Sequence, residues 1–534
     1  MLCLSSCYDD SSTLGTQDMG NITLEDDASS DLHIGFQEEL DLSPSLKISS
    51  TIDMSALTYE WKLTETSATS DNEFEVIGTD KDLSYIMQRP ISSAPYVLSL
   101  TITDTAHDNL QYLYSWNVYV QSSFLDGILV CDTQDGNTSD FTLINNATFT
   151  VNYAKDEQIF RHILVNANGI PYDGLLQSLY YGIYGSLGST HTNQIWAVTG
   201  EGSCVRFNCL DYSQNGQYDD ETLFINKSAD TRIYSFFKSY LEFYANTSDG
   251  VYVMTPTISN RFGSISNVFK NYQINNNVIA YSPNTTYSSN YLIENSNNHL
   301  NFYDKEQGAF VTCSGYTQFF SAGSYEANLN FDPNNLPGQT AITSIVYEDM
   351  TQTIFLLKDD ATGEYTIYTL TPDISEEGTS PEQPASAKNK FAIPSEGKTL
   401  LDNAVSIFFS NKNLVLYVAT SDGIYAINYG AGTTATVSTV AKFTPDNGEV
   451  ITKAKMFQQG IYKYDLSLIK ESNATVPELE WSNNSIMIVT QKGEYEGKLY
   501  VIPISQSAIG TLDVSKAKVY DGFGKILDVT STGY

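Results

Sequence analysis

The chain has 534 residues, which at ~150 residues per domain suggests two to four domains, or one small domain and one large all-β unit. Its 63 acidic and 28 basic residues give a net charge of −35, and such a surface repels phosphate backbones, which excludes DNA and RNA as partners. No apolar stretch reaches the ~18 residues that a membrane-spanning helix needs.

A lipobox lies near the start of the chain, in the run Leu4-Ser5-Ser6-Cys7. Small residues stand next to the cysteine because the peptidase that cleaves beside it admits only small side chains. The paired acids Asp9 and Asp10 resemble the surface-export signal of Bacteroidetes lipoproteins. We therefore expect a lipid on Cys7 that anchors the protein to the outer membrane, facing the cell exterior, as its only membrane contact.

A signal peptide would normally carry a basic region and an apolar region before such a cysteine. Only six residues precede Cys7 and both regions are missing, so we expect the start to be trimmed or misplaced. The alternative is that Cys3 and Cys7 are ordinary residues of a frayed terminus.

The segment after the lipobox is acidic. Ten acids lie between Asp9 and Asp41, whereas the first basic residue is Lys47. Like charges repel one another and keep such a segment extended. Residues 1–20 are therefore expected to hold a truncated lipoprotein signal and an acidic tether, and residues 21–41 are better explained as the solvated face of a first strand.

Short strands with alternating apolar residues are predicted between residues 21 and 122. One contains Tyr59 and Trp61 on the same face, and another runs from Tyr96 to Asp104. Several strands within about 100 residues indicate a β-sandwich. The Tyr-x-Trp strand followed by Tyr-x-Leu-x-Leu-x-Ile-x-Asp resembles the PKD-like, immunoglobulin-related fold, which implies a spacer or docking module. Trp61 and Trp116 are then expected in its core.

A unit of strand, Gly/Asp turn and second strand recurs along residues 123–534, which is a sign of repeated β architecture. Two copies, at Ser248–Tyr252 and Ser421–Tyr425, are nearly identical in sequence. The seven copies are centred on Ile128–Phe141, Ile195–Phe207, Ser248–Tyr252, Phe302–Phe310, Phe355–Tyr365, Ser421–Tyr425 and Met487–Tyr500.

Seven β-units without helical periodicity predict a seven-bladed β-propeller, because radial repetition leaves only short, protected edges. A β-helix and a pair of sandwiches are the rival architectures, and a β-helix needs a shorter and more uniform period. The expected fold class is thus all-β, with an Ig/PKD-like β-sandwich over residues 21–122 and a β-propeller over residues 123–534. The Pro/Ser-rich segment Pro372–Pro394 is expected to be an exposed loop of the propeller.

The lipobox, sandwich and propeller together resemble the PKD-like family of Bacteroidetes surface lipoproteins. Four segments carry the resemblance: Cys7–Asp10, Asp126–Leu129 with its acidic turn, Asp332–Gly338 and Gly522–Ile526. Ile128 stands where the family often has Trp. Members tend to accompany TonB-dependent outer-membrane importers of the starch-utilisation type. The resemblance therefore implies a non-catalytic accessory of an importer complex that binds a glycan or peptide ligand.

Enzymatic activity is the competing hypothesis. Five histidines are scattered singly, with no HExxH pattern, and the chain lacks a Gly-x-Ser-x-Gly elbow and a sialidase box. Glycoside hydrolysis needs only two suitably spaced carboxylates, and 63 acids offer many pairs. We expect no catalysis, and a surface hydrolase of glycans or peptides with its active site in the propeller is the alternative. Converging carboxylates in a cleft would favour the enzyme, and a shallow aromatic groove would favour binding.

One loop has the spacing of a calcium site. Asp211, Ser213, Asn215, Gly216 and Asp219 fall at positions 1, 3, 5, 6 and 9 of such a loop, but position 12 is threonine where a bidentate glutamate belongs. A hairpin turn that binds nothing is the other interpretation. A structural calcium ion is thus the only cofactor that the sequence suggests.

Aromatic rings offer the sequence-based candidates for ligand contact. Tyr180, Tyr181 and Tyr184 lie among glycines that are expected to prevent a regular strand, and they lead into Trp196. Exposed amphipathic rings would suit a sugar or a peptide. Packing in the core is the alternative.

The cysteines beyond the lipobox are too sparse for a disulfide framework. We expect all four to be buried small hydrophobic residues: Cys131, Cys204, Cys209 and Cys313.

Overall fold

Alternating burial along the first strands builds a β-sandwich from the N-terminal part of the chain. In the computed structural model the chain divides into two compact units, Met1–Ser123 and Phe124–Tyr534. The structure describes residues 20–25, 31–36, 38–65, 74–89, 94–121, 124, 127–151, 153, 155–184, 192–214, 224–225, 228–239, 242–248, 250–254, 269–271, 299–305, 307–314, 320–322, 330–346, 352–371, 386–410, 412–459 and 479–532.

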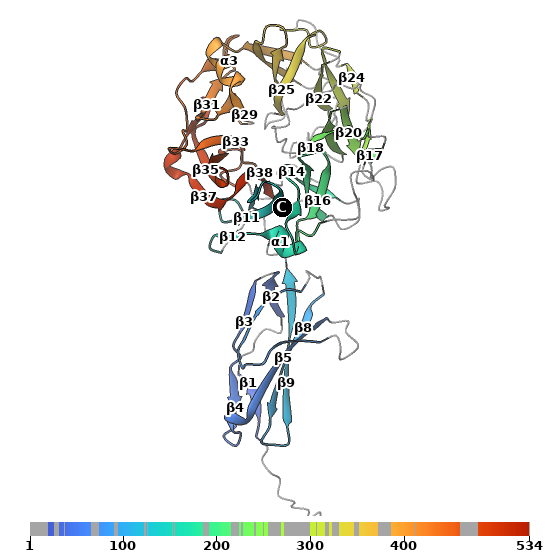
Figure 1. The fold of residues 1–534 in the computed structure, drawn as a ribbon, viewed down its shortest axis with the longest axis vertical. Helices are drawn as coiled ribbons and strands as arrows, with labels where there is room; N and C mark the ends of the chain where they lie inside the picture. Colours follow the sequence, from blue (N-terminus) through green and yellow to red (C-terminus); the bar gives the residue numbers. More distant parts are fainter. Residues whose placement is uncertain are drawn as a thin grey trace, which may run out of the picture. The chain divides into compact units, whose positions relative to one another are not determined.

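The first unit has a five-stranded sheet and two short strand pairs (Figure 1). The sheet has the order β2 (Asp31–Gly35), β9 (Leu110–Gln121), β8 (Tyr96–Asp104), β5 (Leu57–Glu65), β6 (Glu75–Gly78), and only β2 and β9 pair in parallel. The strand pairs are β1 (Ile22–Leu24) with β4 (Leu46–Ile48) and β3 (Glu39–Leu42) with β7 (Leu83–Ile86), and a 3₁₀ turn, η1, spans Met54–Ala56.

Tryptophans fill the centre of this unit, as the sequence predicts. Trp61 is fully buried and Trp116 nearly so, with ring centroids 5.6 Å apart. The Trp61 indole Nε1 donates a 2.9 Å hydrogen bond to the carbonyl oxygen of Asp80, which satisfies its polar atom. Their cluster includes Ile22 and Leu83 from the short strand pairs, so the pairs close the sandwich over the sheet.

The second unit is a β-propeller whose described residues form seven sheets arranged in a ring (Figure 1). Blade 1 contains β10 (Gly127–Thr133), β11 (Thr138–Asn145), β12 (Gln158–Phe160), β13 (Tyr172–Asp173) and β38 (Lys525–Thr532). Blade 2 contains β14 (Leu176–Tyr184), β15 (Thr192–Thr199) and β16 (Cys204–Asn208), and blade 3 contains β17 (Phe224–Ile225), β18 (Ile233–Ser239), β19 (Glu242–Thr247), β20 (Gly250–Met254) and β21 (Phe269–Asn271). Blade 4 contains β22 (His299–Asp304), β23 (Ala309–Ser314) and β24 (Phe320–Ala322). Blade 5 contains β25 (Gln339–Val346), β26 (Thr353–Asp359), β27 (Tyr365–Thr371) and β28 (Ser386–Ala392). Blade 6 contains β29 (Ala404–Phe409), β30 (Val415–Thr420), β31 (Gly423–Asn428) and β32 (Thr436–Val437). Blade 7 contains β33 (Val450–Met456), β34 (Ser485–Lys492), β35 (Glu496–Gln506), β36 (Thr511–Leu512) and β37 (Lys518–Phe523).

Each of the seven repeats predicted from sequence is the hairpin of one blade. The two nearly identical copies, for example, are the β19–β20 and β30–β31 hairpins. The interpretation of Pro372–Pro394 as a loop is wrong for its last part, because β28 pairs with β27 along Ser386–Ala392. Alternate side chains of β28, such as Ala387 and Phe391, are buried, so a polar stretch still supplies one apolar face.

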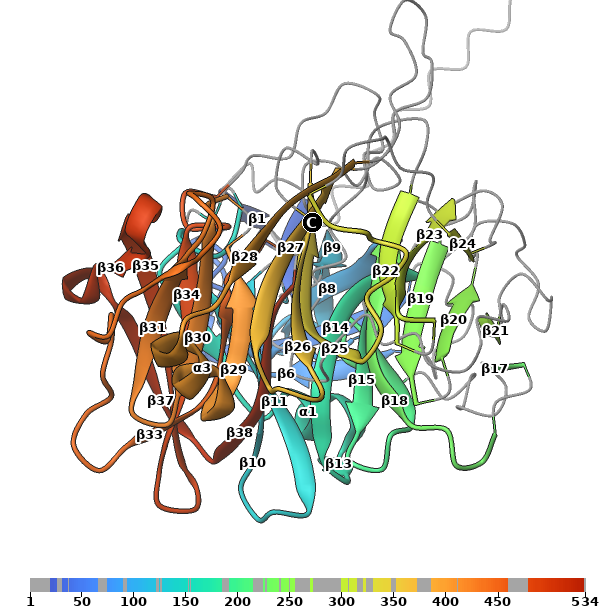
Figure 2. The same cartoon turned by 90° about the horizontal axis from the view of Figure 1, so that it is seen from above.

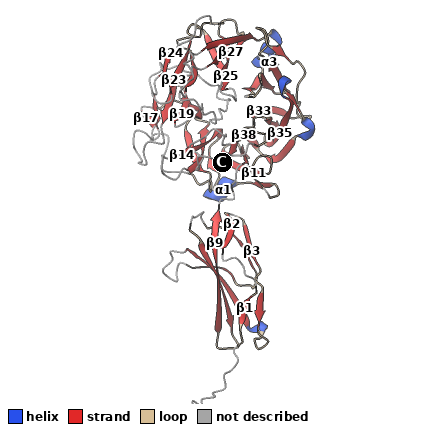
Figure 3. Ribbon diagram, turned by 180° about the vertical axis from the view of Figure 1, so that it is seen from behind, coloured by secondary structure: helices blue, strands red, loops and turns tan. Residues whose placement is uncertain are grey.

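Helices are few and short (Figure 3). Those that the structure describes in the second unit are α1 (Ile163–Asn168), α3 (Ser395–Asp402) and the 3₁₀ turns η4 (Ser507–Ile509) and η5 (Val514–Lys516). Among the described residues, none of the helices has both the length and the apolar character required for crossing a bilayer.

The ring closes by pairing its last strand with its first. β38 lies antiparallel to β10, from Gly127 opposite Thr532 to Thr133 opposite Lys525. Blade 1 is therefore built from both ends of the propeller. Gly524, just before β38, makes this possible, because a Cβ there would overlap the carbonyl oxygen of Thr133.

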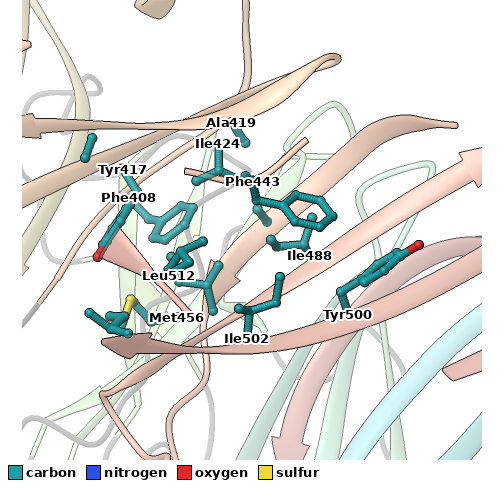
Figure 4. Close-up of a cluster of buried hydrophobic side chains, with 14 of the residues drawn as sticks. Phe408, Tyr417, Ala419, Ile424, Phe443, Met456, Ile488, Tyr500, Ile502 and Leu512 are labelled. Carbon is teal, nitrogen blue, oxygen red and sulfur yellow. The ribbon is translucent and has the colours of Figure 1, made fainter. Parts of the chain in front are cut away.

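Neighbouring blades pack face to face through apolar side chains. Figure 4 shows the interface of blades 6 and 7, where Phe408 and Tyr417 lie near Met456, Ile488 and Ile502. In the edge-on view of Figure 2, strands such as β25 and β26 run from one face of the ring to the other. The ring is thus a rigid support for side chains at strand ends and in the turns between strands.

Candidate functional site

A small cavity lies in blade 1, between the β10–β11 hairpin, α1 and the end of β37. Its volume is about 180 Å³. The lining exposes more apolar than polar surface, and its residues carry two carboxylates, a guanidinium, an imidazole, an amide and hydroxyls. The residues are Asp132, Gln134, Thr138, Asp140, Thr142, Arg161, His162, Val165, Pro171 and Gly522.

Strand pairing brings the two carboxylates together. Asp132 on β10 is the register partner of Asp140 on β11. Side chains of directly paired residues project from the same face of a sheet, with Cβ atoms ~4.5–5.5 Å apart. The turn between them is fixed by Asp135, whose Oδ1 accepts 2.8 Å hydrogen bonds from the amides of Asn137 and Thr138.

Asp132 is 6% exposed and is only partly satisfied. Its Oδ2 accepts hydrogen bonds from the amide of Gly524, at 2.7 Å, and from Nε2 of Gln134, at 2.9 Å. No described residue donates to its Oδ1. Burial raises the pKa of Asp132, and the nearby carboxylate of Asp140 adds to that effect. Closing the ring with Gly524 therefore also positions this carboxyl group.

Asp140 is held by both of its oxygens. Its Oδ1 accepts 2.8 Å hydrogen bonds from the amides of Phe141 and Leu164, and Oδ2 lies 3.3 Å from Nδ1 of His162. Leu164 is in the first turn of α1, so Asp140 satisfies an amide that has no partner within the helix. His162, which precedes α1, has a left-handed backbone with φ of 56°. The hairpin and α1 are thus tied together beside the cavity.

Arg161 supplies the positive charge. Its two terminal nitrogens donate to the carbonyl oxygens of Gly522, at 3.1 Å, and Asp521, at 2.8 Å. The guanidinium carbon lies 5.1 Å from the centre of the Phe523 ring. These contacts fix the guanidinium in place and leave its remaining N–H groups for other partners, because a guanidinium carries five.

The aromatic residues predicted to contact a ligand are placed differently. Tyr180, Tyr181 and Trp196 are buried, and Trp196 has no exposed surface. The prediction that glycines prevent a strand is wrong, because Leu176–Tyr184 forms β14 and pairs along β15. Tyr180 and Trp196 pack between blades 2 and 3 with Phe236 and Tyr252, so they are core residues. The backbone of Tyr184 belongs to β14, but its side chain lies outside the described residues.

Only the start of the predicted calcium loop is described. The amide and hydroxyl of Ser213 donate to Oδ1 of Asp211, at 2.9 and 2.7 Å, which is the geometry of an Asx turn. Asn215 and Asp219 lie outside the described residues. In the part of the chain that the structure describes, no group of three or more His, Cys, Asp or Glu side chains is placed to hold a metal ion.

The lipidation and export residues Cys7, Asp9 and Asp10 also lie outside the described residues, as does the side chain of Cys313. The other cysteines follow the prediction of small buried residues. Cys131, Cys204 and Cys209 are buried and form no disulfide.

Sequence reasoning missed the cavity residues. A signal was present, since Asp132 and Asp140 lie at equal distances on either side of Gly136. Residues equidistant from a hairpin turn face each other across it. No comparable signal marks Arg161 and Gly522, which meet from segments more than 300 residues apart.

Comparison with known proteins gives a family for the N-terminal third. Residues 7–174 match the model of the PKD-like family. The match covers the β-sandwich and β10 to β13, so it includes every cavity-lining residue except Gly522. A search of the curated proteins finds none that matches the chain.

Solved structures give distant likenesses. The WD40 domain of SCAP from fission yeast is 10% identical, with 67% of this chain and 73% of that chain covered and a TM-score of 0.30. A protein from Lactobacillus plantarum is 10% identical, with coverages of 89% and 99% and a TM-score of 0.31. The extracellular domain of a putative hybrid two component system from B. thetaiotaomicron is 10% identical, with coverages of 96% and 69% and a TM-score of 0.30.

TM-scores this low support no conclusion about this chain. The assignment of the second unit as a β-propeller therefore rests on the strand pairing described above. The chain thus contains a PKD-like family domain at residues 7–174, which spans its β-sandwich and most of the first blade of its β-propeller.

Proposed function

We propose that this protein is a non-catalytic, lipid-anchored protein of the Bacteroidetes outer membrane that binds a ligand for a TonB-dependent importer of glycans or peptides. The observation that carries the binding role is the blade 1 cavity, where a buried carboxylate and a fixed guanidinium face a space of about 180 Å³. The anchoring role is supported by the lipobox at Cys7, a residue that the family match includes.

The hydrogen bonds of the cavity favour binding over catalysis. Both oxygens of Asp140 already have partners within the protein. Glycoside hydrolysis places two working carboxyl groups on opposite sides of the bond that breaks. Asp132 and Asp140 instead lie side by side on one sheet, and Asp132 Oδ1 is the carboxylate oxygen of this pair to which no described residue donates.

A surface hydrolase is the second candidate, and one observation favours it. Burial and the nearby Asp140 raise the pKa of Asp132, and a carboxyl group with a raised pKa is suited to general acid catalysis. Incubation with a panel of oligosaccharides and peptides tests this activity. Turnover that Asp132→Asn abolishes would establish the hydrolase, and absence of turnover with every substrate supports the binding role.

Anchoring is tested in the native cell by comparing two cysteine variants. We expect Cys7→Ala to move the protein from the outer-membrane fraction to the soluble fraction, because the acylated thiol is lost. Cys3→Ala is the matched control and should remain with the membrane. Identical fractionation of the two variants would refute the lipidation of Cys7.

Export and partnership need their own measurements. Asp9→Ala combined with Asp10→Ala should protect the protein from protease added to intact cells, whereas Asp26→Ala combined with Asp27→Ala should leave it accessible. Capture of the wild type from solubilised outer membranes should recover a TonB-dependent importer. Recovery of no importer from either the wild type or Cys7→Ala would remove the accessory role.

A further inference from the structure

We infer that the blade 1 cavity binds a single neutral sugar unit, with the Asp132 carboxylate as the acceptor for its hydroxyl groups. The inference rests on the proposed binding function and specifies its site and ligand class. It depends on three observations: a fixed carboxylate with one oxygen that accepts no hydrogen bond from the described residues, a lining that holds groups of both charges, and a volume that suits one small unit.

The acceptor is built into the fold. Asp132 is 6% exposed, lines the cavity, and is fixed through Oδ2 by Gly524 and Gln134. Among the described residues no donor reaches Oδ1. This oxygen is not enclosed by protein atoms, so it can accept a hydrogen bond from a molecule in the cavity. A ligand with hydroxyl groups would supply that missing donor.

The charged groups around the cavity leave a small excess of negative charge. Asp132 and Asp140 carry negative charge, whereas Arg161 carries positive charge and His162 lies beside Asp140. An anionic ligand would add to this excess, and a cationic ligand would meet the guanidinium of Arg161, which lines the same cavity. A neutral polyol can donate to Asp132 and accept from Arg161 and Gln134, because every hydroxyl group both donates and accepts.

The size of the cavity suits one small unit. Its volume of about 180 Å³ lies below the ~300–1,000 Å³ of drug-sized pockets. The side chains of Val165 and Pro171 give the wall an apolar portion against which the C–H groups of a sugar ring can pack.

An amino acid is the competing ligand. Its ammonium group would bind Asp132 and its carboxylate would need the guanidinium of Arg161. Both terminal nitrogens of Arg161 already donate to the carbonyl oxygens of Gly522 and Asp521, which restricts a bidentate contact with a second carboxylate. The cavity therefore favours hydroxyl groups over a zwitterion.

The test is saturation-transfer difference NMR on the full chain. The probes are the methyl glycosides of glucose, galactose, mannose and N-acetylglucosamine at millimolar concentrations, with glycine and alanine as the amino-acid probes. At least one glycoside should receive saturation from the wild type. Asp132→Asn should lower its affinity by 5-fold or more, because the amide keeps one acceptor and loses the charge.

Two further variants separate the cavity from the rest of the molecule. Val165→Phe fills the cavity and should abolish transfer to the glycosides. Val440→Phe is the matched control, because Val440 is 74% exposed on blade 6, and it should bind as the wild type does. Thermal melting of each variant verifies folding, and Arg161→Lys replaces any variant that does not fold, with a 5-fold or greater loss of affinity expected.

Three outcomes would overturn the inference: no transfer to any glycoside, transfer that Asp132→Asn and Val165→Phe leave unchanged, or transfer to the amino acids alone. Each can occur while the importer is still captured from outer membranes. In that case the sugar site fails and the accessory function stands. If no importer is captured but glycoside binding is intact, the accessory function fails and the sugar site stands.

Discussion

Lys455 Nζ lies 3.0 Å from Oδ1 of Asp528, and both side chains are buried where the last blade meets the strand that closes the ring. Lys453 Nζ lies 3.0 Å from the same oxygen, and Oδ2 accepts a 2.7 Å hydrogen bond from the amide of Leu179 on β14. Burial alone would raise the pKa of Asp528, but the two ammonium groups hold it below its ordinary value. One carboxylate therefore joins blades 7, 1 and 2.

The first prediction concerns this buried cluster. Asp528→Asn should lower the free energy of unfolding of the propeller by about 3–5 kcal/mol, because the buried ammonium group of Lys455 and the partly buried one of Lys453 lose their counter-charge. Urea denaturation followed by circular dichroism measures the change. The control is Lys516→Met, which removes an ammonium group that is 71% exposed and should have little effect. A loss below about 1 kcal/mol for Asp528→Asn would mean that the cluster does not stabilise the closure.

The same closure marks the limit of what the sequence could predict about the fold. Each hairpin repeat is local, because its strands and turn lie within about 15 consecutive residues, and all seven could be recognised. The pairing of β38 with β10 joins residues about 400 positions apart. No periodicity in either strand specifies that partner, so the pairing emerges only when the ring is assembled.

The second prediction concerns the glycine at this closure. Gly524→Ala should destabilise the propeller by more than about 2 kcal/mol, because the new methyl group would overlap the carbonyl oxygen of Thr133 and displace the amide that binds Asp132. The shift in thermal melting temperature measures the loss. Gly200→Ala is the control, because the nearest neighbour of its methyl group would be the flexible Gln177 side chain, at 3.1 Å, and the carbonyl oxygen of Leu175 would lie at an ordinary contact distance of 3.8 Å. Equal shifts for the two variants would contradict the steric argument.

The candidate site was harder to predict than the fold. Tyr180 and Trp196 have the amphipathic rings of a binding site, but strand propensity and burial between two blades determine where they lie. Asp132 was recognisable from its position opposite Asp140 across the turn, whereas Arg161 was not. Its position depends on carbonyl groups of β37, which reach it only through tertiary packing.

The third prediction concerns the sandwich core. Trp61→Ala should cost about 3–5 kcal/mol of stability in the N-terminal unit, because a fully buried large ring leaves a cavity. Trp61→Phe should cost less, since it keeps most of the apolar volume but leaves the Asp80 carbonyl without its indole donor. Denaturation followed by tryptophan fluorescence measures both. Met54→Ala, at a 67% exposed position, is the control, and a loss as large as that of Trp61→Ala would contradict the assignment of the core.

The fourth prediction concerns the turn that carries the cavity. Hydrogen bonds from the amides of Thr138 and Asn137 lower the pKa of Asp135 to about 2. A carboxyl group whose folded pKa lies below its unfolded value of ~3.9 stabilises the fold above pH ~4, and this stabilisation disappears as the pH falls toward ~2. Asp135→Asn is the matched variant, because it keeps an oxygen acceptor in the turn and does not titrate. The melting temperatures of wild type and variant should therefore differ most above pH ~5 and converge between pH ~4 and ~2. The other carboxylates titrate in both proteins and cancel in the comparison, so a difference that stays constant over this range would show that the Asp135 charge does not stabilise the turn.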